Sequence, residues 1–287
     1  MEVLRMISLA IVVALSSLVV AGCDVQEQME DDELVESGAG EQGEETNNEG
    51  GQTDDAHCPH HLPFGAPSQT DYLLCRETFT VGYNAVTKQA DWVAYSITAD
   101  SVGVYIERTD DFREDGELLL RARSTLEHYS GSGYDRGHLA PAATVGTTKA
   151  TMSDSFILSN ISPQLAGFNR DGWADLESAV RDCVYDQQSL YVITGPVIPD
   201  EDGERIDRNG PVIPSAFFKL IMTTSAPYKA LALVVPHAEF SMTGVEAFIV
   251  TPNELEELVG IDIGASLDDG IEVEMESESV NFCAMPM

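Results

Sequence analysis

This chain carries the stretch GSGYDRGHLAP from Gly131 to Pro141. Three glycines surround a charged pair, Asp135 and Arg136, and His138 follows directly after the third glycine. Because glycine adopts backbone conformations that other residues avoid, the chain can turn tightly here and present Arg136 and His138 into one cleft. A histidine near its ordinary pKa is well suited to take a proton from an attacking water. The stretch therefore indicates a catalytic loop with His138 as a general base.

Asn169 and Glu177 are the candidates for holding a metal ion. They lie eight residues apart in a segment with helical spacing, which is about 80° around a helix and about two turns along it. Both side chains can therefore face the same space. An amide oxygen and a carboxylate are hard ligands, and they suit Mg²⁺ or Mn²⁺ that keeps most of its waters.

The hydrophobic pattern predicts a mixed domain. Runs with strand character occupy residues 91–98, 156–158, 190–193, 216–222 and 230–235. Apolar residues spaced by three and four predict an amphipathic helix over 171–186. Thr251 and Pro252 have the character of a helix start and predict a second helix that continues to Leu258. Because strands and helices alternate without regular βαβ spacing, we expect an α+β domain around a central, mostly antiparallel sheet.

The tetrad DRGH at 135–138 resembles the signature of the DNA/RNA non-specific endonucleases, the ββα-metal or His-Me finger family that includes Serratia-type nucleases and endonuclease G. Seven further stretches resemble that family in its own order, at 91–95, 108–115, 158–164, 169–177, 194–196, 213–219 and 254–262. Together they cover most of residues 72–263. The resemblance implies an α+β, ββα-metal nuclease fold with a central, mostly antiparallel sheet flanked by helices.

The resemblance also implies a role for each matching residue at the reacting centre. His138 matches the general base. Asn169 matches the direct protein ligand of one divalent ion, Mg²⁺ or Mn²⁺, and Glu177 matches a carboxylate that reaches the ion through water. Loss of such an outer carboxylate usually weakens a metal site.

Three more residues match positions around that centre, and Arg170 and Asp135 have expected roles beside them. Asn160 matches an asparagine that holds the geometry of the site. Arg136 matches a residue that contacts the substrate phosphate, and Arg108 matches one that steadies the leaving group. Arg170 is assigned to substrate binding. Asp135 is expected to fix the loop without taking part in the chemistry.

The reaction implied by the resemblance is hydrolysis of phosphodiester bonds in DNA and RNA to products with 5′ phosphates. The alternative is a catalytically weak or inactive surface lipoprotein that uses the same fold to bind a polyanion or a protein partner. The other histidines, His57, His60, His61, His128 and His237, are interpreted as surface or packing residues, and Trp92 and Trp173 as core residues.

The N-terminal residues predict export and a lipid anchor. Arg5 precedes an apolar run from Met6 to Ala21, which is short for a membrane span and ends in small residues, as signal peptides do. The sequence LVVAGC at 18–23 resembles a bacterial lipobox, in which Cys23 is acylated. Because two or more acyl chains anchor a protein stably, we expect a lipid-anchored exported protein on a periplasmic or cell-surface face. A plain secretory peptide is the alternative.

Composition divides the remainder of the chain into a tether and a domain. From Asp24 to Asp55 there are 13 acidic residues and no Lys or Arg, and such a segment cannot bury enough apolar surface to fold. We therefore predict a signal peptide over 1–22, an acidic disordered tether over 23–56 and a nuclease domain over 57–287.

Four cysteines remain beyond Cys23, and an even number after an export signal favours two disulfides. The preferred pairs are Cys58–Cys75 and Cys183–Cys283, although the other two pairings stay open. The competing interpretation is a zinc site of Cys58, His60 and His61, which lacks a second half.

The charge of the predicted domain opposes its expected substrate. Residues 57–287 contain 35 acidic and 14 basic residues, so the net charge near −21 has the wrong sign for long-range attraction of nucleic acid. Eight of the 14 basic residues lie between Arg108 and Arg181, the stretch that contains every candidate catalytic residue. Basic charge is therefore expected to gather at the site.

Overall fold

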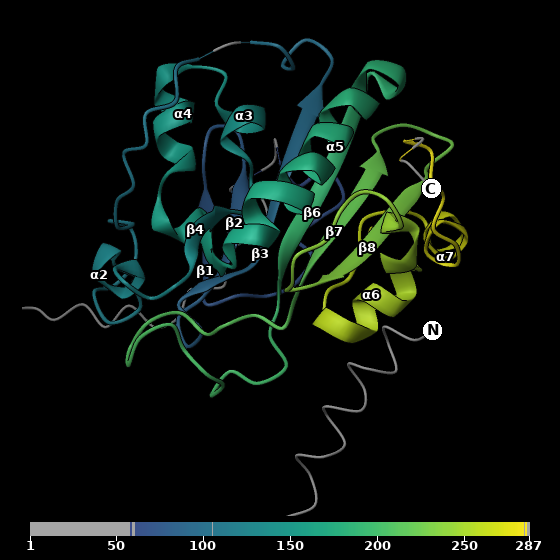
Figure 1. Cartoon of the computed structure of the whole chain (residues 1–287). Coiled ribbons are helices and arrows are strands. Elements are labelled where there is room, and N and C mark those ends of the chain that lie inside the picture. Colours follow the sequence, from purple (N-terminus) through teal and green to yellow (C-terminus); the bar gives the residue numbers. More distant parts are fainter. Residues whose placement is uncertain (1–57, 59–60, 105, 284, 286–287) are drawn as a thin grey trace, which may run out of the picture. The chain divides into compact units, whose positions relative to one another are not determined.

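The computed structural model describes residue 58, residues 61–104, residues 106–283 and residue 285. The main framework is a seven-stranded sheet in the order β1-β2-β3-β6-β7-β8-β9, and all its neighbouring strands are antiparallel (Figure 1). The strands are β1 (Tyr72–Cys75), β2 (Thr80–Asn84), β3 (Gln89–Thr98), β6 (Ser189–Val197), β7 (Ala216–Thr223), β8 (Ala230–Pro236) and β9 (Ile249–Val250). The expected antiparallel sheet is confirmed.

The central strands β7 and β8 follow from continuous apolar runs. All eight residues of β7 are buried, as are all but the last residue of β8. A strand that is covered on both faces needs apolar side chains on both, so its sequence is continuous rather than alternating. Within β7 one charged residue, Lys219, is fully buried.

Helices surround this sheet, and α5 lies across one face of it, in contact with β3 and β6 (Figure 1). The α-helices are α2 (Leu126–Tyr129), α3 (Ala142–Val145), α4 (Lys149–Ser155), α5 (Ala174–Gln187), α6 (Pro252–Val259) and α7 (Asp269–Glu276). The other helices are the 3-10 turns η2 (Leu158–Asn160) and η4 (Val245–Phe248) and the π-helix η3 (Phe168–Trp173). The amphipathic helix predicted over 171–186 is confirmed in α5, which buries Leu176, Val180, Cys183 and Val184.

The helix predicted after Thr251 is also confirmed. The hydroxyl of Thr251 accepts a hydrogen bond from the backbone N–H of Glu254, and the carboxylate of Glu254 accepts one from the backbone N–H of Thr251. This reciprocal capping satisfies two backbone N–H donors at the start of α6. Pro252 has no backbone N–H and therefore needs no acceptor there.

A separate two-stranded sheet carries the DRGH tetrad. β4 (Asp135–His138) pairs antiparallel with β5 (Ile161–Gln164), and His138 lies opposite Ile161. The helices α3, α4 and η2 lie between β4 and β5 in the chain, and β5 leads through η3 into α5. A side chain could not replace the hydrogen of Gly137, because its Cβ would lie 2.0 Å from the amide oxygen of Gln164. Gly133 has a positive φ of 86°, which confirms the tight turn before β4.

The strand predicted over 156–158 is wrong. Phe156 ends α4, and η2 begins at Leu158. All three residues are buried, with Ile157 forming only an isolated bridge to Arg113. A short apolar run indicates that a segment is buried. A turn between two packed helices can be buried just as a strand can.

The start of α5 also differs from expectation. Asn169 lies in the π-helix η3 and Glu177 in the regular helix α5, so the angle of about 80° expected for eight residues of a regular helix does not apply. A π-helix has more residues per turn, and such turns are frequent at functional sites.

Both preferred disulfides are present. Cys58 is bonded to Cys75, with their Cα atoms 5.5 Å apart, and Cys183 to Cys283, with Cα atoms 4.9 Å apart. The second bond attaches the C-terminal segment to α5. The zinc interpretation is wrong, because the disulfide occupies the sulfur of Cys58. His60, its other proposed ligand, lies outside the described residues.

The predicted signal peptide, Cys23 and the acidic tether lie outside the described residues, as does His57. The described residues fall in one compact unit, Asp54–Met287. None of their helices is both long and apolar enough to cross a membrane. Trp92 and Trp173 are buried in the core, as expected.

Candidate active site

His138 lies at the end of β4 in apolar surroundings. Its side chain is 9% exposed, and its ring centroid lies 4.9 Å from that of Phe156 and 5.6 Å from that of Phe112. Within the described part of the chain, Nε2 has no hydrogen-bond partner. Burial, reinforced by the positive charges of Arg108 and Arg136, lowers the pKa of His138 to about 3. The imidazole is therefore neutral at physiological pH.

Two arginines approach His138 over the same pair of rings. The guanidinium carbon of Arg108 lies 4.7 Å from the ring centroid of Phe156, and that of Arg136 lies 4.1 Å from the centroid of Phe112. Arg108 also pairs with Asp110 at 2.6 Å, but both side chains are more than half exposed. Because exposed ion pairs contribute little, Arg108 can exchange Asp110 for a phosphate at small cost.

Asn160 fixes the chain where it leaves β4. Its Oδ1 accepts a hydrogen bond from the backbone N–H of Ala140 at 2.9 Å, and its Nδ2 donates to the carbonyls of Ala140 and Ser155 at 3.0 and 2.9 Å. The backbone N–H of Leu139 donates to the carbonyl of Asn160. The side chain is fully buried. Its predicted role in holding the site geometry therefore has a physical basis, since these bonds determine where His138 lies.

Asp135 joins β4 to η3. Its carboxylate accepts hydrogen bonds from Nε and Nη2 of Arg170 at 2.7 and 2.6 Å and from Nδ2 of Asn169 at 3.0 Å. These contacts, those with Arg170 foremost, lower the pKa of Asp135. A carboxylate can only accept, so the amide nitrogen of Asn169 must face it. The amide oxygen of Asn169 is thereby left available for another partner.

Glu177 lies in the first turn of α5 beside two cations. Burial raises the pKa of its carboxyl group, and the charges of Lys219 and Arg181 oppose that rise. Nζ of Lys219 lies 3.4 Å from the hydroxyl of Thr194 and 4.5 Å from the ring centroid of Trp173. Burial lowers the pKa of Lys219, and Glu177 opposes that change. Each charge therefore lessens the effect of burial on the pKa of the other.

The donor set at this side suits a hard divalent cation. Asn169 offers a free amide oxygen whose orientation Asp135 fixes, and Glu177 offers a carboxylate. Oxygen donors of this kind are those that Mg²⁺ and Mn²⁺ prefer. No cluster of three or more His, Cys, Asp or Glu side chains in the described residues could hold a metal ion.

A cavity of about 490 Å³ opens beside β4. It is lined by Leu126, Glu127, Tyr129, Ser130, Tyr134, Asp135 and Arg136. The exposed guanidinium of Arg136 therefore borders a space that can take part of a substrate.

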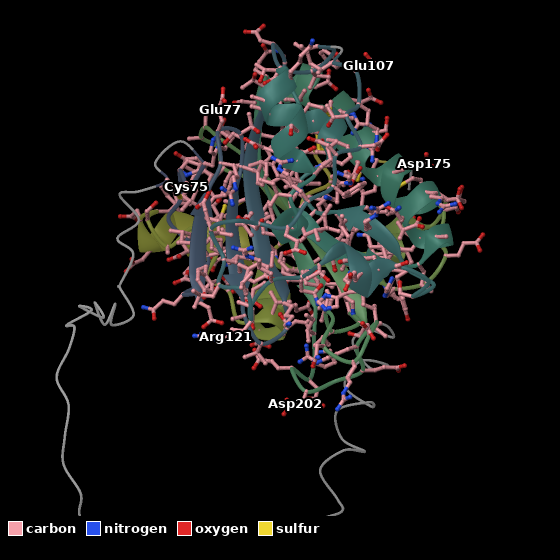
Figure 2. The ribbon with its side chains drawn as sticks, turned by 90° about the vertical axis from the view of Figure 1, so that its left-hand side faces the viewer. Cys75, Glu77, Glu107, Arg121, Asp175 and Asp202 are labelled. Atoms are coloured by element: carbon pink, nitrogen blue, oxygen red, sulfur yellow. A yellow bond between two sulfur atoms is a disulfide. The ribbon has the colours of Figure 1, made fainter. Side chains whose placement is uncertain are left out.

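Acidic charge is distributed around the outside of the domain. Glu77, Glu107, Asp175 and Asp202 are all exposed, and Figure 2 shows them on different sides of the molecule. The basic residues Arg108 and Arg136, by contrast, both lie near His138.

The structure brings most of the predicted site residues together. Arg108 influences both His138 and Glu177, and Asp135 contacts Asn169 and Arg170. Arg170, predicted to bind substrate, has its guanidinium engaged by Asp135.

Sequence reasoning gave no role to Lys219, Arg181 or His237. Arg181 follows Glu177 by one helical turn, and that i,i+4 spacing was a readable signal. Lys219 stands in a run of apolar residues, and a lysine there was the sign of a buried charge.

Comparison with known proteins agrees with this geometry. A family profile described as DNA/RNA non-specific endonuclease matches residues 60–270. Nuclease C1 of Cunninghamella echinulata var. echinulata is 34% identical over 222 residues, which cover 72% of this chain and 88% of that protein. Mitochondrial endonuclease G of Homo sapiens is 32% identical, covering 69% and 71%. The nuclease of Serratia marcescens is 29% identical, covering 77% and 85%.

A solved structure is similar over most of its length. A chain in the crystal structure of an EndoG/EndoGI complex superposes with a TM-score of 0.66 at 28% identity, covering 73% of this chain and 92% of that one. The expected α+β, ββα-metal nuclease fold is confirmed.

Proposed function

The chain belongs to the DNA/RNA non-specific endonuclease family and is a hydrolase of that kind, and we propose that it cleaves both DNA and RNA with His138 as the general base. One observation carries this proposal. Nε2 of His138 is buried, yet it lacks a hydrogen-bond partner among the described residues. An unpaired buried polar atom is costly, and because the ring is neutral, one of its two nitrogens keeps a lone pair that can take a proton from a water that attacks phosphorus.

The two arginines bind the phosphate and adjust the base. Arg108 and Arg136 offset the charge of the phosphodiester, which is greatest in the transition state. A phosphate between them also cancels part of the positive charge that lowers the pKa of His138. Substrate binding thus raises the basicity of the imidazole where proton transfer needs it. Arg170, exposed beside Asp135, contacts the nucleic-acid backbone further along.

A divalent cation, Mg²⁺ or Mn²⁺, would be held directly by Oδ1 of Asn169, with Glu177 reaching it through water. When bound, it supplies Lewis-acid stabilisation of charge on the phosphate and the departing oxygen. The protein prepares this position. Asp135 orients the amide of Asn169, and the charge of Lys219 favours the ionised form of Glu177.

The products carry 5′ phosphates, because water attacks phosphorus while the 3′ oxygen departs. Since the proposed contacts are to phosphates, little base specificity follows. The grouped arginines of the site act at short range, which fits an acidic domain whose overall field does not attract substrate.

We place the enzyme outside the cytoplasm, anchored through acylated Cys23 with residues 24–56 as a spacer. The lipobox-like sequence and the acidic composition support this. Replacing Cys23 with Ala should release the protein from the membrane fraction. Mass spectrometry of the mature N-terminal peptide would detect the acyl chains, and an unmodified membrane-free protein would contradict the anchor.

The test of function is cleavage of plasmid DNA and structured RNA by the disulfide-bonded protein with Mg²⁺, Mn²⁺ or chelator. We expect metal-dependent cleavage of both, 5′-phosphate ends, and loss of cleavage in Asn169→Ala. A folded protein that cleaves neither substrate at low or high salt, but retains polyanions or a protein partner, would favour the binding lipoprotein instead.

A further inference from the structure

His237 follows β8 directly and has both ring nitrogens paired with backbone. Its Nδ1 lies 2.9 Å from the carbonyl oxygen of Pro214, and its Nε2 lies 2.8 Å from the backbone nitrogen of Leu165. A carbonyl only accepts and a backbone amide only donates, so Nδ1 carries the hydrogen and Nε2 is the acceptor. The imidazole is thus neutral with one tautomer, and burial lowers its pKa in agreement.

The contact of His237 leads directly to Asn169. The backbone N–H of Leu165 donates a hydrogen bond to His237. The carbonyl of Leu165 accepts one from the backbone N–H of Asn169 at 2.9 Å. Leu165 is the first residue after β5, where the chain turns into η3. Two consecutive hydrogen bonds therefore connect the end of the main sheet to the backbone of Asn169.

The residues after His237 also pack against η3. A Cβ on Gly172 would lie 2.5 Å from the carbonyl oxygen of Phe240, so the backbones of η3 and this segment are in close contact. The ring of Phe168 in η3 lies 5.5 Å from that of Phe240 and 5.4 Å from His237, between centroids. His237 also packs 5.1 Å from Phe217 of β7. The π-helical turn is thus held against the main sheet through His237 and its neighbours.

We propose that His237 is a positioning residue that fixes the backbone of η3 through Leu165, so that the amide of Asn169 is set for a divalent cation. The inference rests on the proposed function, because it assigns Asn169 to the metal. Two features of His237 could hold η3, its ring packing and its two hydrogen bonds. The proposal assigns the effect to the hydrogen bonds.

Two substitutions separate these features. His237→Phe keeps an aromatic ring against Phe168 and Phe217 but leaves the amide of Leu165 without its acceptor. His237→Asn removes the ring but retains one donor and one acceptor. The matched control is His128→Ala, which removes an imidazole that accepts from the backbone N–H of Thr125 at 3.1 Å in α2, away from η3.

The measurements are Mn²⁺ affinity, by paramagnetic resonance of the free ion, and hydrogen exchange of the backbone around 163–173 in the full chain. We expect His237→Phe to weaken Mn²⁺ binding by about 10- to 100-fold, the usual effect of losing an outer contact of a metal ligand, and to speed exchange at Asn169. His237→Asn should stay within about threefold of the unsubstituted protein, as should His128→Ala.

Several results would overturn the inference. One is a His237→Phe protein with unchanged Mn²⁺ affinity; another is a His237→Asn protein that loses more affinity than His237→Phe, since packing alone would then explain the effect. An equal loss in His128→Ala would show general destabilisation. If His237→Phe fails to fold, His237→Asn decides: retained affinity supports the hydrogen bonds, and a loss above about tenfold refutes them. An unsubstituted protein that neither binds Mn²⁺ nor cleaves would overturn the proposed function and this inference together.

Discussion

His138 and Glu177 stand on two sides of the candidate active site in surroundings of opposite chemistry. His138 lies between phenylalanine rings, and burial makes it neutral. Glu177 is half-buried, which raises the pKa of its carboxyl group, but the charges of Lys219 and Arg181 favour its ionised form. Burial alone therefore does not determine whether a site residue is ionised. The charges nearby add to the effect of burial on the pKa of His138 and oppose it at Glu177.

The largest expected effect comes from replacing His138, on the apolar side of the candidate active site. His138→Ala should lower kcat by about 10³-fold, because general-base catalysis contributes about 10²- to 10⁴-fold. The protein should stay folded, since Nε2 of His138 makes no hydrogen bond within the described residues. Single-turnover cleavage with His128→Ala as control measures this. A His138→Ala protein with a tenth of normal kcat would assign the base elsewhere.

The next prediction concerns the acid stability of that side. The folded-state pKa of His138 is depressed to about 3, so folding favours the neutral ring. This stability is present above the unfolded pKa of about 6.5 and is lost as pH falls below it, at about 1.4 kcal/mol per pH unit. At pH 5 the loss is about 2 kcal/mol.

Urea unfolding of the unsubstituted protein and His138→Phe at pH 7 and pH 5 checks this prediction. The phenylalanine variant cannot be protonated, so its unfolding free energy should fall less over that interval. Parallel losses in the two proteins would mean that His138 is not desolvated in the folded state.

On the charged side, Lys219→Met should raise the pKa of Glu177 further, because it removes the charge that most strongly opposes the effect of burial. An opposite charge nearby typically shifts a carboxyl pKa by about one unit or more, so kcat/KM at pH 6.5 should drop about tenfold and recover as pH rises. The pH profile is the measurement. Lys149→Met removes the same charge from an exposed position of α4 and should leave the profile in place. An equal loss of kcat/KM at every pH would show that Lys219 does not act through the ionisation of Glu177.

The smallest expected effect concerns the exposed edge of the charged side. Arg170→Ala removes two of the three hydrogen bonds on Asp135 but leaves the one that orients Asn169. Mn²⁺ affinity should therefore fall only about threefold, well below the effect of losing an essential outer contact. Calorimetric titration tests this, and a loss as large as that of Asn169→Ala would show that Arg170 itself organises the site.

Local patterns in the sequence were sufficient for much of this protein. The DRGH tetrad, the apolar strands β7 and β8 and the helix α5 all depend on residue type and short spacing. The even number of cysteines predicted two disulfides, and the structure selected the preferred pairing. Such patterns failed at Phe156–Leu158, where burial was correct but the strand was not. Burial is what an apolar run encodes, and the backbone shape depends on the neighbours.

The contacts that tune the site needed the tertiary structure. Asp135 meets Arg170 across 35 residues of sequence, Lys219 of strand β7 acts on Glu177 of helix α5, and His237 reaches Leu165 across 72 residues. No local spacing predicts which distant side chains meet. The sequence by itself was sufficient for the family, and it supplied the candidates for the base and the metal ligands. Only the folded arrangement decided their protonation and orientation, because desolvation and partner charges depend on what surrounds a group in space.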